Sequence, residues 1–283
     1  MEWRCSHEKY VLDLFKRAML STEFFTDYRE VGYPEMTQRF VLLGTTGYHP
    51  NDHRQTACMM LPELGIVLDA GSAMYRVTDY LETDTLDIFL THAHLDHVVG
   101  LTFLYDVLAQ RTLRHVRVHA VAEKLAAIRD HLFAPAIFPV QPPCEFVELV
   151  DRFELEDGGC IRNFPLEHPG GSVGYRFDWP DRSLAYVTDT VANTEAEYVS
   201  NITGVDTLLH ECYFSDKQKE LADKTGHSVT TEVAKVAAKA GVGRLFLVHM
   251  NPLSTDEDPI GLATAQSIFA KTELTFDRME LKV

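Results

Sequence analysis

Short apolar runs separated by polar turns recur along most of the chain, and they predict buried strands alternating with helices. The expected strands lie at 39–45, 56–61, 65–68, 86–90, 116–119, 146–150, 160–166, 173–177, 183–187, 206–209, 245–248 and 274–281. Apolar positions at helical spacing predict helices over 7–20, 98–110, 122–132, 193–199, 230–240 and 259–270. This alternation is typical of an α/β protein with two or more sheets.

The first 37 residues differ from the rest of the chain. One apolar stripe over 7–20 predicts an amphipathic helix, and residues 26–37 have the pattern of a linker. We therefore expect an N-terminal helical extension over 1–37, which packs on the domain or on a partner subunit, and one large domain over 38–283. A homodimer is compatible with such a helix.

The amino-acid composition limits which cellular compartment and which classes of partner we expect for this protein. The 283 residues contain no apolar run near the roughly 20 residues of a membrane helix. Five scattered cysteines without a C-x-x-C pair fit a reducing cytoplasm. A net charge of −16 argues against a long polyanionic partner, because nucleic-acid binders use basic surfaces. It does not exclude a small phosphate ester drawn to bound divalent cations.

The densest group of chemically active residues is Thr91-His92-Ala93-His94-Leu95-Asp96-His97, between an expected strand and an expected helix. His92 and His94 are two residues apart, so an extended backbone points both to the same side. Three imidazoles and one carboxylate within six residues can hold one or two metal ions. Nitrogen and oxygen ligands without thiolate favour Zn, while Mn and Fe are alternatives.

This HxHxDH motif resembles the signature of the metallo-β-lactamase fold superfamily. The resemblance implies a four-layer αβ/βα sandwich over 38–283 and further ligands at later strand ends. His168, Asp189 and His249 each follow an expected strand and match that pattern. The implied first metal site is His92, His94 and His168; the second is Asp96, His97 and His249; Asp189 bridges them. Asp69, in a turn after 65–68, matches a residue that orients ligands in this superfamily.

A second resemblance narrows the branch. Members that reduce oxygen carry Glu at the position of His94, so the histidine favours the hydrolases. The segments Leu208–Phe214 and Gly226–Ser228 resemble the LIHEATF and GHST segments of ribonuclease Z, the tRNA 3′-processing endonucleases. The resemblance implies that His227 is a general acid and that Glu211 orients it. His210 points to the other side of its strand and is expected to be structural.

One departure from ribonuclease Z concerns the substrate. That family inserts a long tRNA-binding arm between the positions of His168 and Asp189, and here twenty residues separate them. This spacing makes tRNA an unlikely substrate and favours the arm-less relatives, which hydrolyse small or cyclic phosphodiesters.

The leading hypothesis is therefore a dinuclear metal-dependent phosphodiesterase with a small-molecule substrate. In it Asp96 steers the proton of the attacking water, and His227, held by Glu211, protonates the leaving alkoxide. A thioesterase or lactonase of the same fold is the alternative, and a metal-bound protein without catalytic activity is the third. His49, His53 and Arg54 fit either substrate contacts or a solvated loop.

Overall fold

Two mixed sheets form the centre of the part of the chain that the structure describes. The structure is a computed structural model, and it describes residues 38–254 and 256–283. The expected helix over 7–20 and the extension over 1–37 lie outside the described residues and stay predictions. Each sheet has seven strands, and both combine an antiparallel half with a parallel half.

The first sheet has the strand order β14-β1-β2-β3-β4-β5-β6. Its strands are β1 (Arg39–Gly44), β2 (Cys58–Leu61), β3 (Ile66–Leu68), β4 (Thr85–Phe89), β5 (His115–Ala120), β6 (Glu145–Glu148) and β14 (Met279–Lys282). Strands β14, β1, β2 and β3 pair antiparallel, whereas β3, β4, β5 and β6 pair parallel.

The second sheet has the order β13-β12-β11-β10-β9-β8-β7. Its strands are β7 (Arg152–Glu154), β8 (Cys160–Leu166), β9 (Ser172–Asp178), β10 (Ser183–Val187), β11 (Thr207–Glu211), β12 (Arg244–Val248) and β13 (Thr272–Leu274). Here β7 to β10 pair antiparallel and β10 to β13 pair parallel.

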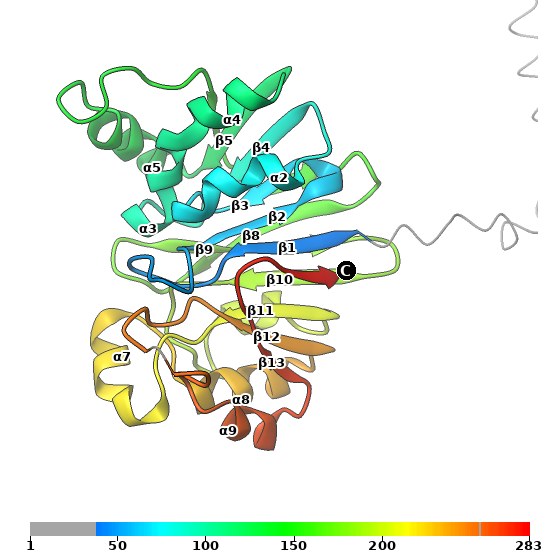
Figure 1. Cartoon of the computed structure of the whole chain (residues 1–283). Helices are drawn as coiled ribbons and strands as arrows, with labels where there is room; N and C mark the ends of the chain where they lie inside the picture. Colours follow the sequence, from blue (N-terminus) through cyan, green and yellow to red (C-terminus); the bar gives the residue numbers. More distant parts are fainter. Residues whose placement is uncertain (1–37, 255) are drawn as a thin grey trace, which may run out of the picture. The chain divides into compact units, whose positions relative to one another are not determined.

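Helices cover the outer face of each sheet, with α2, α4 and α5 on one side and α8 and α9 on the other (Figure 1). They are α2 (Val77–Tyr80), α3 (Leu95–Val98), α4 (Leu104–Gln110), α5 (Ala122–Ala127), α6 (Tyr198–Asn201), α7 (Lys219–Thr225), α8 (Thr230–Ala240) and α9 (Leu262–Ile268). Short 3₁₀ turns are η1 (Pro62–Leu64), η2 (Ser72–Arg76), η3 (Val99–Phe103) and η5 (Asp216–Gln218), and η4 (Ile128–Leu132) is a π-type turn.

Three apolar clusters hold these layers together. One lies between the two sheets and includes Phe40, Tyr175 and Phe246. The other two fill the spaces between each sheet and its helices. Two facing sheets with helices outside both confirm the expected four-layer αβ/βα sandwich.

The candidate ligands and the residues expected to orient them lie at the carboxyl ends of β3, β4, β8, β10, β11 and β12. Carboxyl ends of parallel strands meet at one edge of a sheet, which is where α/β proteins build their sites. The ends from both sheets therefore supply one common edge for the candidate ligands.

Two element predictions were wrong. The expected helix over 193–199 is replaced by the short α6, because the Asn193 side chain accepts a hydrogen bond from Glu195 N and favours a turn there. The expected strand over 274–281 is two strands, β13 and β14, which belong to different sheets. Between them Arg278 adopts a left-handed φ of 66°, which breaks the extended conformation.

Two further features bear on the sequence predictions. Among the described residues, none of the helices has the length and apolar character needed to cross a membrane. The four cysteines in that part of the chain, Cys58, Cys144, Cys160 and Cys212, are free thiols.

Candidate metal centre

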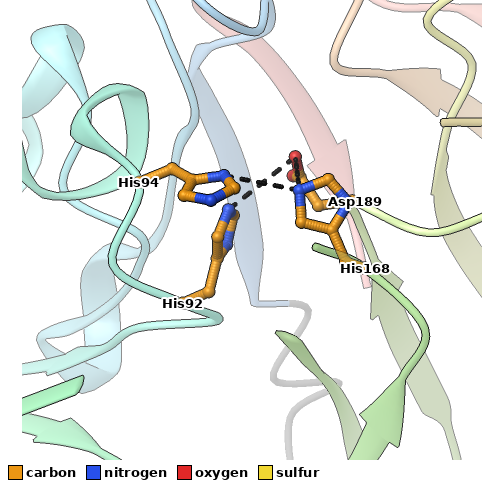
Figure 2. Close-up of side chains that lie close together, drawn as sticks. All are labelled: His92, His94, His168 and Asp189. Atoms are coloured by element: carbon orange, nitrogen blue, oxygen red, sulfur yellow. Dashed lines mark hydrogen bonds and ion pairs between the residues drawn. The ribbon is translucent and has the colours of Figure 1, made fainter. Parts of the chain in front are cut away.

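The first ligand cluster joins the loop after β4 to two strand ends of the second sheet. Figure 2 shows His92, His94, His168 and Asp189 converging on one point. His168 Nε2 lies 3.4 Å from His94 Nδ1 and 3.5 Å from Asp189 Oδ1. His92 Nε2 lies 3.8 Å from the same Asp189 oxygen.

The second cluster consists of Asp96, His97 and His249. The Nε2 atoms of His97 and His249 are 3.1 Å apart, and each lies 3.4 Å from Asp96 Oδ2. Asp189 Oδ2 lies 3.1 Å from His97 Nε2 and 3.4 Å from His249 Nε2. Asp189 therefore turns one carboxylate oxygen toward each cluster.

The spacing of these atoms fits divalent cations. A tetrahedral zinc ion with bonds of about 2.0–2.1 Å has ligand atoms roughly 3.3–3.4 Å apart, which is close to the separations in both clusters. The buried Nε2 of His92 has no hydrogen-bond partner among the described residues. Facing imidazole nitrogens without donors between them are costly to bury, so a cation would satisfy them.

Hydrogen bonds behind the clusters fix which nitrogen of each ring faces inward. His97 Nδ1–H donates to Asp69 Oδ2 at 2.9 Å, so Asp69 orients this ligand as expected. His92 Nδ1–H donates to the Thr91 hydroxyl at 3.0 Å, which in turn donates to Asp69 Oδ1 at 2.9 Å. His168 Nδ1–H donates to the Gly226 carbonyl at 2.9 Å. Each of these hydrogen bonds engages Nδ1, so Nε2 is the nitrogen that each ring turns toward its cluster.

The backbone is strained at three of the strand ends that carry these groups. Asp69, Asp189 and His249 have φ angles of 59°, 53° and 57°, in the left-handed region that non-glycine residues rarely adopt. Such conformations cost on the order of 1 kcal/mol or more each and gather at functional sites. The fold thus gives up stability to aim side chains from both sheets at one point.

Burial and opposite charges pull the imidazole pKa values apart. Burial, helped by the neighbouring His97, lowers the pKa of His92 well below its ordinary value. Burial also opposes protonation of His97, but Asp189, Asp69 and Asp96 outweigh it and raise the pKa of that ring. These three carboxylates therefore stabilise positive charge at the site, and a bound divalent cation would replace the protons that supply this charge in the metal-free protein.

The Glu211 carboxylate, fully buried at the end of β11, holds His227 beside the two clusters. Glu211 Oε1 accepts hydrogen bonds from Thr190 N at 2.7 Å and from His227 Nδ1 at 3.2 Å. Its other oxygen accepts one from Ser228 N at 3.2 Å. Burial works against the charged ring, yet Glu211 raises the pKa of His227 to about 9. A nitrogen of His227 lies within 4.8 Å of ligand atoms of Asp189 and His249.

Three site contributions were not predicted from the sequence. Thr91 links His92 to Asp69, although only its place before the motif could have suggested this. The Tyr213 ring stacks on His227, with centroids 4.4 Å apart. Tyr48 N donates to Asp96 Oδ2 at 2.7 Å and so holds a ligand by its backbone.

Other singled-out residues lie outside the centre. His210 Nε2 contacts the Tyr198 hydroxyl at 2.9 Å, in line with its expected structural role. Arg54 donates to Thr45 Oγ1 and to the Thr275 carbonyl, both at 2.6 Å, and so ties loops together. His53 is exposed, and His49 Nδ1 contacts only the carbonyl of Pro50 among the described residues.

Comparison with known proteins identifies the family to which this chain belongs. The model of the family described as the Beta-lactamase superfamily domain matches residues 66–250. Ribonuclease Z from Acaryochloris marina (strain MBIC 11017) is 38% identical over 255 residues, which are 69% of this chain and 79% of that protein. Ribonuclease Z from Prochlorococcus marinus (strain MIT 9313) is 38% identical over 137 residues, 47% of this chain. That alignment spans only 40% of the Prochlorococcus protein.

The fold has solved counterparts. The metallo-β-lactamase fold protein YhfI from Bacillus subtilis superposes with a TM-score of 0.71, covering 87% of this chain and 99% of that one. Sequence identity in this pair is 16%, so the likeness concerns the fold alone.

Proposed function

The chain belongs to the β-lactamase superfamily and is homologous to ribonuclease Z, and from this premise we propose that it is a dinuclear metal-dependent phosphodiesterase acting on small or cyclic phosphodiesters. The observation that carries the proposal is the His227–Glu211 pair beside the two clusters. Hydrolysis of an alkyl phosphodiester expels a poor leaving group, which needs a proton donor close to the reacting phosphorus.

Two divalent ions, with zinc favoured and Mn or Fe as alternatives, complete the proposed site. His92, His94 and His168 would hold one, Asp96, His97 and His249 the other, and Asp189 would bridge them. When bound, the ions supply a nucleophile from water at neutral pH and neutralise charge on phosphoryl oxygens. Nitrogen and carboxylate ligands without thiolate support these metals.

The chain's own residues move the protons. Asp96 is fixed by Tyr48 N and faces the second cluster, where its carboxylate would steer the proton of the attacking water. Glu211 fixes the orientation of the His227 ring, and in the metal-free protein it raises the pKa of that ring to about 9, so the pair favours the protonated form of His227. His227 then donates its proton to the departing alkoxide, and stacking on Tyr213 holds the ring for that step.

The segment between His168 and Asp189 supports a small substrate over tRNA. It consists of β9, β10 and the short turns around them, all within the described residues. An inserted arm of the ribonuclease Z type has no place in this hairpin. The net charge of −16 also weighs against a long polyanion.

The test is turnover of bis(p-nitrophenyl) phosphate by zinc-loaded protein, beside a thioester and a lactone of similar size. Preference for the phosphodiester is expected. Faster hydrolysis of the carbonyl substrates would transfer the assignment to a thioesterase or lactonase.

A variant pair separates the acid role of His227 from a general loss of structure. His227→Ala should slow an alkyl p-nitrophenyl phosphate little, since nitrophenolate leaves unaided, and slow a dialkyl phosphodiester by roughly 10²–10⁴-fold. His131→Ala, at an exposed position on η4, is the matched control and should slow neither. Equal losses on both esters in His227→Ala would remove the acid role.

A further inference from the structure

Three large apolar side chains are exposed around the second ligand cluster. Tyr48 is 73% exposed, Leu95 is 68% exposed and Leu253 is 77% exposed. Leu95 directly precedes the candidate ligand Asp96, and Leu253 follows His249 by four residues. We call these three side chains the apolar rim. Exposed apolar side chains that gather beside a candidate reaction centre indicate contact with a ligand or a partner.

Hydrogen bonds bring the three segments that carry the rim together. Tyr48 N donates to Asp96 Oδ2 at 2.7 Å, so Tyr48 lies next to the segment of Leu95. Asn51 Nδ2 donates to the carbonyl of Pro252, the residue before the third rim leucine, at 3.0 Å. The loop after β1 therefore contacts both of the other segments, and the rim borders the second cluster.

Tyr48 is held in a backbone conformation that its own side chain disfavours. Its φ is 60°, in the left-handed region where a bulky residue is rare. Glycine would adopt this conformation without strain, whereas a tyrosine there costs stability. The ring is largely exposed, and its aromatic neighbour is His49, edge to face with centroids 5.2 Å apart. Packing within the described part of the chain does not offset the strain, which indicates a role for the ring in binding.

The shape and the charge of the rim indicate the kind of ligand. A tyrosine ring offers a flat apolar face, and another flat ring gains more from it than apolar contact alone. Leu95 and Leu253 add apolar surface and no charge. An uncharged ring also avoids the repulsion that a chain of net charge −16 exerts on a further anionic group.

We propose that the apolar rim binds a planar aromatic ring on one alcohol part of the phosphodiester substrate, and that Tyr48 stacks on this ring. The inference rests on the proposed phosphodiesterase function and names both a substrate class and the residue that selects it. A substrate whose phosphate lies at the metal centre needs only a short link to place a ring on Tyr48, because Tyr48 is hydrogen-bonded to the candidate ligand Asp96.

The test compares benzyl methyl phosphate with cyclohexylmethyl methyl phosphate, using zinc-loaded protein and chromatography of the released alcohols. The two esters differ only in whether the ring is flat and aromatic. The benzyl ester should have a kcat/KM about two- to tenfold higher, although the cyclohexyl ring is the more apolar one. This ratio should not change with salt, since neither ring carries charge.

Variants assign the ratio to Tyr48. Tyr48→Leu should bring the ratio to about one and leave zinc affinity unchanged, because the backbone N–H that holds Asp96 remains. Tyr48→Phe should keep the ratio, since stacking needs the ring and not the hydroxyl. Tyr105→Leu is the matched control, at an exposed tyrosine of the outer helix α4 whose hydroxyl donates to the Gln141 carbonyl. It should leave the ratio unchanged.

Three results would overturn the stacking role while the phosphodiesterase function stands. The first is an equal kcat/KM for the two esters, or a preference for the cyclohexyl ester. The second is a benzyl preference that survives Tyr48→Leu or falls equally in Tyr105→Leu. The third comes from light scattering: a dimer that Tyr48→Leu converts to monomer, with the ester ratio unchanged, would assign the rim to contact with a second copy.

A binding measurement keeps the two proposals apart. If no phosphodiester, including bis(p-nitrophenyl) phosphate, is hydrolysed, the proposed function fails. Calorimetric titration of the zinc-loaded protein with benzyl phosphate and with cyclohexylmethyl phosphate then decides the rim alone. Tighter binding of benzyl phosphate that is lost in Tyr48→Leu supports it, and equal affinities reject it.

Discussion

Gly47, in the loop after β1, leaves room for the imidazole of His249. A Cβ placed on Gly47 would lie 2.2 Å from His249 Cε1 and 2.5 Å from its Nε2. Ordinary contact between such atoms needs about 3.5 Å, so the ring would have to retreat by roughly 1 Å. Gly47 has no left-handed φ, so alanine itself fits the backbone.

Gly47→Ala should therefore damage the second ligand cluster without unfolding the protein. His249 Nε2 now lies 3.4 Å from both Asp96 Oδ2 and Asp189 Oδ2, and a shift of roughly 1 Å would spoil that spacing. Mutations of residues that position a metal ligand typically cost about 10–100-fold in metal affinity. Zinc titration against a chromophoric chelator should show one of two ions bound about 10–100-fold more weakly, with a matching loss of phosphodiester turnover.

A double-mutant cycle tests whether the effect passes through His249. In a His249→Ala background the ring is gone, so adding Gly47→Ala should cost little further affinity or activity. Losses that simply add would show that Gly47 acts elsewhere. Full zinc affinity in the single variant Gly47→Ala would refute the steric argument altogether.

Three more predictions concern the same centre. Asp69→Asn should weaken zinc binding about 10–100-fold by chelator competition, because it loosens His97 and Thr91; unchanged affinity would contradict its orienting role. Zinc at 100 times its Kd should stabilise the protein by about 2.7 kcal/mol in denaturant unfolding, and no shift would count against a site specific to the fold. In metal-free protein the raised His227 pKa stabilises the fold below about pH 6.5, and this is lost as pH rises through about 9. His227→Gln should thus cost on the order of 3 kcal/mol at pH 6 and little at pH 10, and equal costs would contradict it.

Local pattern predicted most strands because a strand buried in a sheet is itself a short apolar run. The pattern failed where the neighbouring structure decided the outcome. The pattern predicts one strand over 274–281, yet β13 pairs with β12 and β14 pairs with β1. Which sheet a strand joins depends on partners remote in the chain, and no local periodicity records it.

The candidate ligands could be predicted because each stands next to its own strand. The motif at 91–97 and the single residues His168, Asp189 and His249 are local features of the sequence, and the structure brings them together. The roles of Gly47 and Tyr213 could not be predicted, because their partners His249 and His227 are placed by packing.

The sequence by itself determined which donor groups end each strand, because strand, turn and side chain are neighbours along the chain. Only the tertiary structure decided that Asp189 turns one oxygen to each cluster and that His97 meets His249 across 152 positions. Those separations are set by the packing of two sheets through Phe40, Tyr175 and Phe246, and by left-handed turns at three strand ends. Long-range packing of this kind fixes distances that no local spacing contains.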